Sequence, residues 1–205
     1  MTFDLAKARE VLELSLANYS EIRARYWAEV YDTVYEYMST EMRVDRFKSR
    51  MKSAVSFAFL HAAETAYLDG GGTLPLDDET NALFVSLQNQ EYANVDALAE
   101  RLRLLKKEGD GDTIHEAYQR AEGYAKTLDS VYAQIKVMAA GSKMLTFVGD
   151  DGEHTCTDCA KYKNKRHRAS WWVSHNAVPP SRDFECGGWR CAHVLVDDEG
   201  NLFTI

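Results

Sequence analysis

Cysteine is absent from the first 155 residues of this 205-residue chain, and all four cysteines lie in the last fifty. A disulfide framework spreads its cysteines along a chain, whereas four thiols gathered in one segment favour a metal site. The distribution therefore argues against a fold held together by disulfides and directs attention to the C-terminal segment.

The chain also lacks the segments that are typical of secretion and membrane insertion. Residues 1–7 contain no basic stretch followed by an apolar run. No part of the sequence approaches the roughly 18 uninterrupted apolar residues of a membrane span, and the nearest stretch, 54–63, is short. We therefore expect no membrane contact and synthesis in a cytoplasm.

Catalytic motifs are missing as well. The sequence shows no Ser/His/Asp set, phosphate-binding glycine loop or dinucleotide fingerprint. A zinc deaminase needs His-x-Glu before its cysteine pair, and His61 and Glu64 do not have that spacing. We predict that the protein is not an enzyme. The best enzymatic alternative is an HNH-type nuclease that uses His167, His175 and Asn176 beside a structural zinc.

Acidic residues outnumber basic residues by 32 to 24, and the formal net charge is -8. This charge argues against a protein that coats nucleic acid indiscriminately, because phosphate binding needs clustered Lys and Arg. The hydrophobic fraction of 45% is sufficient for a packed core.

Apolar residues that recur every three or four positions predict a helical body. Gly70, Gly71 and Gly72 should end one helix, because glycine accepts the positive φ angles of helix termination. Asp77 or Asp78 should cap the next helix, and Asn94 should open another. The expected helices are 5–39, 42–68, 78–92, 94–109 and 112–141.

After Gly141 the pattern changes from helical to extended. Segments 144–148 and 193–196 are predicted strands, and 202–205 should return beside the second after a turn. We therefore predict a mainly α protein. Residues 1–141 should form an elongated helical body that binds assembly partners, and residues 142–205 a small β-rich, zinc-ribbon-like module.

The cysteine spacing predicts one zinc site in this module. Cys156 and Cys159 form a C-x2-C knuckle, whose two thiolates can reach one ion from a single turn. Cys186 and Cys191 supply the second pair, and the two glycines between them can absorb the longer spacing. Four thiolates in a tetrahedron suit zinc and leave no position for water, so the site should be structural.

Alternatives to the four-cysteine zinc site remain open at this point. The cysteines could instead form two disulfides or hold an iron–sulfur centre. A histidine could also replace one cysteine ligand. The candidates are His193 and, less directly, His154, His167 and His175.

Residues 161–168, between the cysteine pairs, form a basic segment that contains no acidic residue. This segment is the best candidate for nucleic-acid contact. A solvated loop is the simpler interpretation. The bulky residues Trp171, Trp172 and Trp189 are expected to cover the metal rather than stack on bases. The basic residues are Lys161, Lys163, Lys165, Arg166 and Arg168.

The C-terminal region contains an ordered set of motifs at 155–159, 169–172, 179–180 and 185–191, with expected strands at 147–151 and 194–196. This set of motifs resembles the C-terminal region of tailed-phage minor head proteins, the head-morphogenesis family typified by the minor head protein of phage Mu. The resemblance covers about fifty residues.

The resemblance implies a virion protein that is made in the host cytoplasm and acts in head morphogenesis at or near the portal. Its implied partners are the portal or major capsid protein, in multiple copies, with DNA as a further candidate. The first helix carries Trp27, Tyr31 and Tyr35 off its core-facing line. We predict that these aromatics form an exposed assembly surface. A nucleic-acid-binding regulator is the alternative function.

Overall fold

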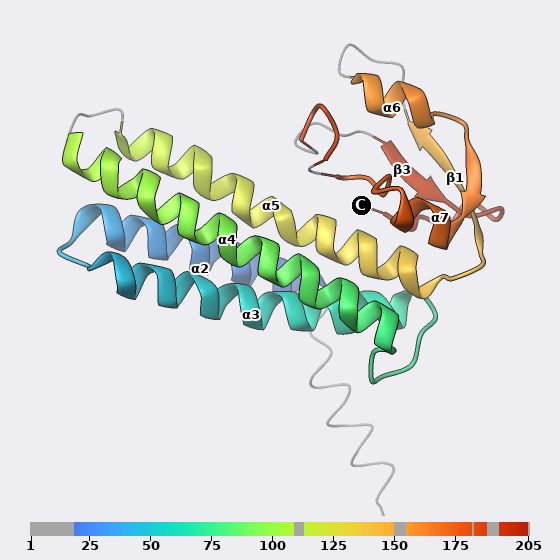
Figure 1. The fold of residues 1–205 in the computed structure, drawn as a ribbon, viewed down its shortest axis with the longest axis horizontal. Coiled ribbons are helices and arrows are strands. Elements are labelled where there is room, and N and C mark those ends of the chain that lie inside the picture. The colour runs from blue at the N-terminus through green and yellow to red at the C-terminus, as the bar shows by residue number, and fades with distance from the viewer. Residues whose placement is uncertain (1–18, 109–112, 150–154, 182, 188–192, 205) are drawn as a thin grey trace, which may run out of the picture.

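The computed structural model describes residues 19–108, 113–149, 155–181, 183–187 and 193–204. Four long helices make up most of the described chain, and a small sheet follows them (Figure 1). The predicted mainly α fold is confirmed. None of the described helices combines the length and the apolar character needed to cross a membrane.

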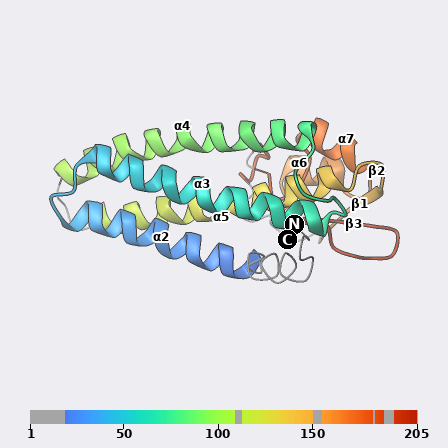
Figure 2. The same ribbon diagram turned by 90° about the horizontal axis from the view of Figure 1, so that it is seen from below.

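The four long helices form a bundle, seen from below in Figure 2. Short connections join successive helices, and such connections place neighbouring helices antiparallel. α3 packs against α2, α4 and α5, and α5 also contacts both α2 and α4. The helices are α2 (Tyr19–Ser39), α3 (Val44–Asp69), α4 (Asp78–Glu108) and α5 (Thr113–Ala139).

Small residues allow α3 and α5 to approach closely across the bundle. Fully buried alanines line the facing sides of both helices, so the backbones can come near each other without large side chains between them. At the end of α3, a Cβ added to Gly70 would lie 2.5 Å from the carbonyl oxygen of Lys136 on α5. The alanines are Ala58, Ala62, Ala63 and Ala66 on α3, and Ala117, Ala121 and Ala125 on α5.

The predicted helix ends are largely confirmed. Asp77 caps α4, because its Oδ1 accepts a hydrogen bond of 2.7 Å from the Thr80 amide. α3 ends at Asp69 before the three glycines, and Gly141 after α5 has a φ of 56°. The predicted stretch 5–18 of the first helix lies outside the described residues.

The predicted break between 92 and 94 is wrong, because α4 is one continuous helix. Asn94 does not open a new helix. Its side-chain amide instead donates 2.9 Å to Glu91 Oε2, one turn earlier. An asparagine interrupts a helix only where its side chain competes for backbone groups, and here it bonds a neighbouring side chain.

The predicted exposed aromatic surface on the first helix is also wrong in part. Trp27 and Tyr31 are half-buried and pack against the bundle core. The Arg23 guanidinium lies 4.6 Å from the Trp27 ring centroid, and Tyr31 lies 5.8 Å from Tyr118 of α5. Only Tyr35 of the three remains well exposed, at 58%. Because α5 packs beside α2, it covers a side of α2 that periodicity alone leaves free.

A three-stranded antiparallel sheet forms the C-terminal module, in the order β2-β1-β3. The predicted strand 144–148 is present as β1 in the centre of the sheet, and the predicted strand 193–196 is present as β3 at one edge. Within the described residues 202–204, a single bridge between Leu202 and Val196 takes the place of the predicted returning strand. The elements are β1 (Met144–Gly149), α6 (Thr157–Tyr162), β2 (Arg166–Arg168), α7 (Ala169–Ser174) and β3 (His193–Val196).

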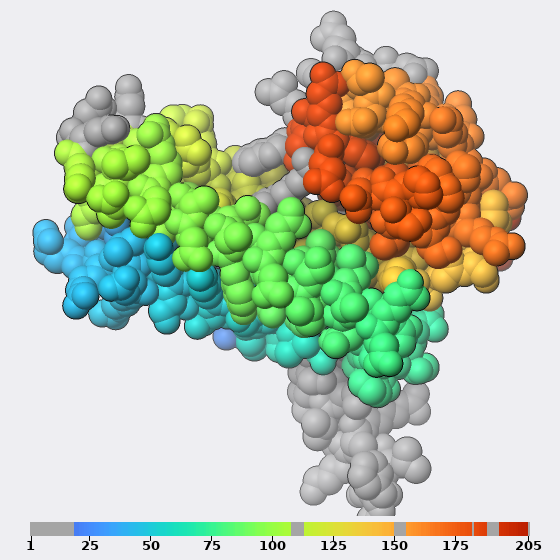
Figure 3. All heavy atoms as spheres, in the orientation of Figure 1, coloured from blue at the N-terminus to red at the C-terminus, as the bar shows by residue number. Residues whose placement is uncertain are grey.

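The module has its own core, and this core extends into the bundle. Leu145, Phe147 and Leu195 point to the buried face of the sheet, where they meet Trp172 and Phe184. Ala133 and Val137 of α5 belong to the same core, although they precede Gly141 in the sequence. Figure 3 shows the module above α5 at one end of the bundle. The last turns of α5 are therefore shared by both parts of the molecule.

Candidate metal centre

The first two cysteines are placed by the start of α6. Cys156 is the N-cap residue of this helix, and its Sγ accepts a hydrogen bond of 3.5 Å from the Cys159 amide. One helical turn carries the Cys159 thiol to the same side, where it is buried at 1% exposure. The knuckle predicted from the C-x2-C spacing thus uses a helix N-terminus, which also favours negatively charged sulfur.

The third cysteine reaches the same point from a distant turn. Phe184 is buried in the module core, and the Gly187 amide returns a hydrogen bond of 2.6 Å to its carbonyl oxygen. Gly187 has a φ of 60°, which glycine adopts without strain. The resulting turn presents Cys186, and the Sγ atoms of Cys156, Cys159 and Cys186 all lie within 4.8 Å of one another.

This arrangement fits a metal ion bound by thiolates. Sulfur atoms at about 2.3 Å from a tetrahedral zinc are roughly 3.8 Å apart, so small adjustments would bring the three thiols to one ion. The three described cysteines form no disulfide. Cys191, the predicted fourth ligand, lies outside the described residues, so a three-thiol cluster is what the structure brings together.

Hydrogen bonds favour the thiolate form at Cys156. Burial raises the pKa of this thiol, but hydrogen bonds from the backbone amides of Cys159 and Cys186, together with those from the two side chains, outweigh burial and leave the pKa below its ordinary value. Of these two amides, that of Cys159 lies within the knuckle, and that of Cys186 connects the knuckle to the distant turn.

Two carboxylates join the cysteine-bearing segments as well. The Asp158 Oδ2 accepts 2.8 Å from the Glu185 amide. In the other direction, Glu185 Oε2 accepts 3.0 Å from the Thr157 amide. The bonds to Thr157 hold the pKa of Glu185 below its usual range. Sequence reasoning missed these residues, because no motif signals a contact between positions 27 residues apart.

The described histidines do not join the thiol cluster. His167 and His175 lie nearly parallel to the Trp171 ring, with centroids at 3.7 Å and 4.0 Å from it. Two rings this close to one centroid can only occupy opposite faces of the indole. The indole therefore separates the imidazoles, which argues against the HNH-type site. His193 is buried and stacks on Phe147, while His154 lies outside the described residues.

The tryptophans take different positions. Trp172 is fully buried in the core that also contains Cys159, and its Nε1 donates 3.2 Å to the Leu145 carbonyl oxygen. Trp171 is half-buried between the two histidines. Trp189 lies outside the described residues. Of the three tryptophans, Trp172 therefore lies in the same core as a cysteine of the thiol cluster, where the sequence predicted a cover for the metal.

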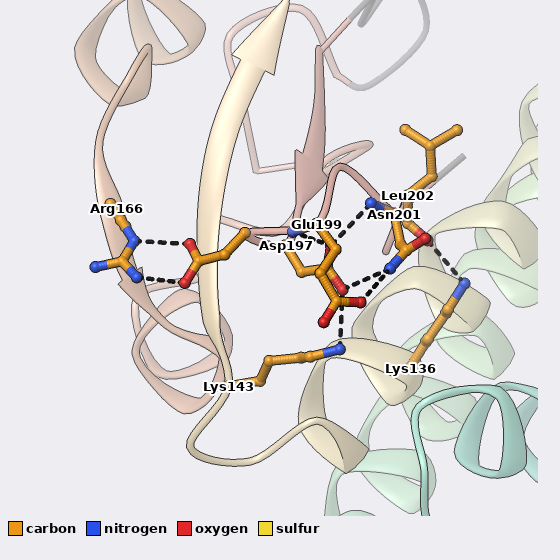
Figure 4. Close-up of polar contacts among 8 residues, drawn as sticks. Lys136, Lys143, Arg166, Asp197, Glu199, Asn201 and Leu202 are labelled. Carbon is orange, nitrogen blue, oxygen red and sulfur yellow. Dashed lines mark hydrogen bonds and ion pairs between the residues drawn. The ribbon is translucent and has the colours of Figure 1, made fainter.

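The basic segment is divided among three structural settings. Arg166, on β2, forms a two-point contact with Asp198 at 3.1 Å and 2.6 Å, drawn with dashed lines in Figure 4. Lys161 on α6 lies 5.0 Å from the Tyr162 ring centroid. Lys165 and Arg168 are exposed, and Lys163 is half-buried. Arg166 is therefore paired with a carboxylate, and nucleic-acid contact by the segment stays a prediction. β2 was missed because three residues carry too short a pattern.

The turn after β3 ties the module to the end of the bundle (Figure 4). The Asp197 carboxylate is buried and accepts hydrogen bonds from Lys143 Nζ at 2.9 Å and from the Asn201 amide at 2.8 Å. Lys136 of α5 donates 3.1 Å to the Leu202 carbonyl oxygen. The bonds from Lys143 and then Asn201 hold the pKa of Asp197 well below its usual range.

Replacement of Asp197 by asparagine tests this turn through pH. A carboxyl group whose pKa is lower in the folded state stabilises the fold above its unfolded pKa of about 3.9, and this contribution is lost as pH falls. The free energy of unfolding should therefore differ most between wild type and D197N at pH 6–7, and the difference should shrink below about pH 4. Denaturant titrations with excess chelator, which keeps both proteins metal-free, measure it. A difference that is constant from pH 6 to 2.5 contradicts the assignment.

A comparison with protein-family models, with curated proteins and with solved structures finds no match for this chain.

Proposed function

We propose that this protein is a structural component of a tailed-phage head, with a C-terminal module held in shape by one zinc ion. The single observation that carries the metal assignment is the meeting of Cys156, Cys159 and Cys186 at one point. The phage assignment rests on the resemblance of the C-terminal motifs to minor head proteins. The helical bundle would bind the portal or the major capsid protein.

Zinc is the ion that the donor set suits best. Three thiolates, with Cys191 as the proposed fourth ligand, would form a soft tetrahedral site, and zinc prefers that geometry. A site closed by four protein ligands leaves no position for water, so its role is to stabilise the module. Zinc bound there would hold two segments about thirty residues apart in sequence, which a small sheet alone does weakly.

An assembly role fits the division of the molecule into a long bundle and a compact module. The bundle exposes apolar side chains on several helices, which are available for contacts with other proteins. The candidates for such contacts are Tyr35, Phe57, Leu60, Val85 and Leu104.

The metal part of the proposal is tested by elemental analysis of the full chain purified without added metal. We expect about one equivalent of zinc per chain and thiols that react with a thiol reagent only after a chelator is added. Absence of zinc together with two disulfides would overturn this part.

The phage part is tested separately by particle incorporation. The tagged chain should co-purify with assembled heads, and the variant Y35A tests whether α2 contributes to the contact, with the exposed Thr73→Ala as control. A zinc-loaded chain that is absent from particles but retained on DNA at low salt would replace the head protein by the nucleic-acid-binding alternative. Loss of that retention on neutralising Lys161, Lys165 and Arg168 would locate the contact.

A further inference from the structure

The two cysteine-bearing segments are joined by a reciprocal pair of hydrogen bonds, from Glu185 N–H to Asp158 and from Thr157 N–H to Glu185. Each donor is a backbone amide next to a cysteine. Thr157 follows Cys156, and Glu185 precedes Cys186. The bonds therefore act on the main chain that carries the sulfur atoms, and they restrain the position of one segment relative to the other.

These bonds also complete the start of α6. The first amides of a helix lack partners within the helix. Cys156 Sγ accepts from the Cys159 amide, and Glu185 accepts from the Thr157 amide, so the knuckle and the distant turn share the capping of one helix. A displacement of the turn would break the Thr157 bond and the Asp158 bond together.

We propose that Asp158 and Glu185 are positioning residues of the metal centre, which hold the Cys186 segment against the Cys156–Cys159 knuckle and slow the loss of the ion. The inference rests on the proposed metal site and adds two residues to it. Partners that orient the ligands of a metal typically change its affinity by about 10–100-fold when they are removed.

A carboxylate near thiolates could also act through its negative charge alone, and two kinds of variant separate these explanations. Asparagine or glutamine removes the charge but keeps an oxygen that accepts the amide hydrogen bond, more weakly than a carboxylate does. Alanine removes both. Asp183 offers a matched control, because it is an exposed carboxylate in the same turn, and among the described residues no hydrogen bond to its side chain connects the two segments; its own amide donates to Ser181 Oγ.

The experiment uses the full chain loaded with one equivalent of Zn²⁺ and follows transfer of the ion to a chromogenic chelator. We expect D158A and E185A each to release zinc about 10-fold faster than wild type. D158N and E185Q should lie between wild type and the alanine variants, and D183A should stay within about twofold of wild type. The double variant should fall short of the product of the single effects, because both bonds join the same segments.

Co²⁺ loading provides the second readout. The thiolate-to-cobalt absorption should be unchanged in all variants that bind the ion, because the ligands are the same. Release rates of D158A and E185A equal to that of D183A, with wild type holding one equivalent, would overturn the positioning role and leave the metal site intact. Asparagine and glutamine variants as fast as alanine would assign the effect to charge and also overturn it. A wild-type chain that binds neither ion overturns the metal site and this inference together.

Discussion

Replacement of Cys159 by serine is expected to remove tight zinc binding and to cost several kcal/mol in the stability of the C-terminal module. Cys159 is the most buried of the three described cysteines, at 1% exposure. A serine hydroxyl is a poor ligand for zinc in a thiolate site, and the free energy of metal binding contributes directly to folding. Thermal unfolding of the wild type and the variant, each with and without a chelator, measures the loss.

The control for C159S is the exposed neighbour Ala160, because A160S introduces the same hydroxyl one residue away. A160S should melt like wild type and should lose stability when the chelator is added. C159S should already melt at the chelated temperature of the wild type, with no further change on chelation. Melting of C159S at the temperature of the zinc-loaded wild type would contradict a structural metal.

Replacement of Trp172 by alanine is the second change with a large expected effect, about 3–5 kcal/mol of unfolding free energy. The Trp172 side chain is fully buried, and its ring centroid lies 5.8 Å from that of Phe147 and 5.9 Å from that of Tyr162. Alanine would leave a cavity in the small core of the module and remove the hydrogen bond to the Leu145 carbonyl oxygen. Denaturant unfolding followed by near-ultraviolet circular dichroism gives the free energy.

Trp171 is the matched control for this prediction, because it is the adjacent tryptophan and is only half-buried. W171A loses its stacking with His167 and His175, which is worth about 1 kcal/mol. The far-ultraviolet signal of the bundle should persist in both variants. A cost for W172A within 1 kcal/mol of that for W171A would show that Trp172 does not organise the module core.

Periodicity located most helices correctly, because burial of one helix face leaves a local pattern in the sequence. The cap at Asp77 and the stop at Gly70–Gly72 were equally local, since each depends on groups within one turn. Asn94 was misread for a related reason. The residue types that favour helix starts also occur within helices when their side chains bond a neighbour, as Asn94 bonds Glu91.

The grouping of the thiols was also open to prediction. The C-x2-C spacing placed Cys156 and Cys159 on one turn, and a distant cysteine pair suggested what would complete the site. The structure brings Cys186 to this point, as expected. Thiols are scarce in this sequence, so their chemistry restricts the possible pairings far more than apolar residues do.

The sequence by itself therefore determined the helical class, the strand-forming character of the tail and the cysteines that meet, because these depend on local pattern or on rare chemistry. Only the tertiary structure decided which surfaces are covered. Trp27 and Tyr31 pack against the bundle core, with Tyr31 beside Tyr118 of α5, and Arg166 of the basic segment pairs with Asp198. The tertiary structure also brings the Asp158 carboxylate to the Glu185 amide. Such contacts join residues far apart in the chain, and their free energy depends on distances that no local pattern encodes.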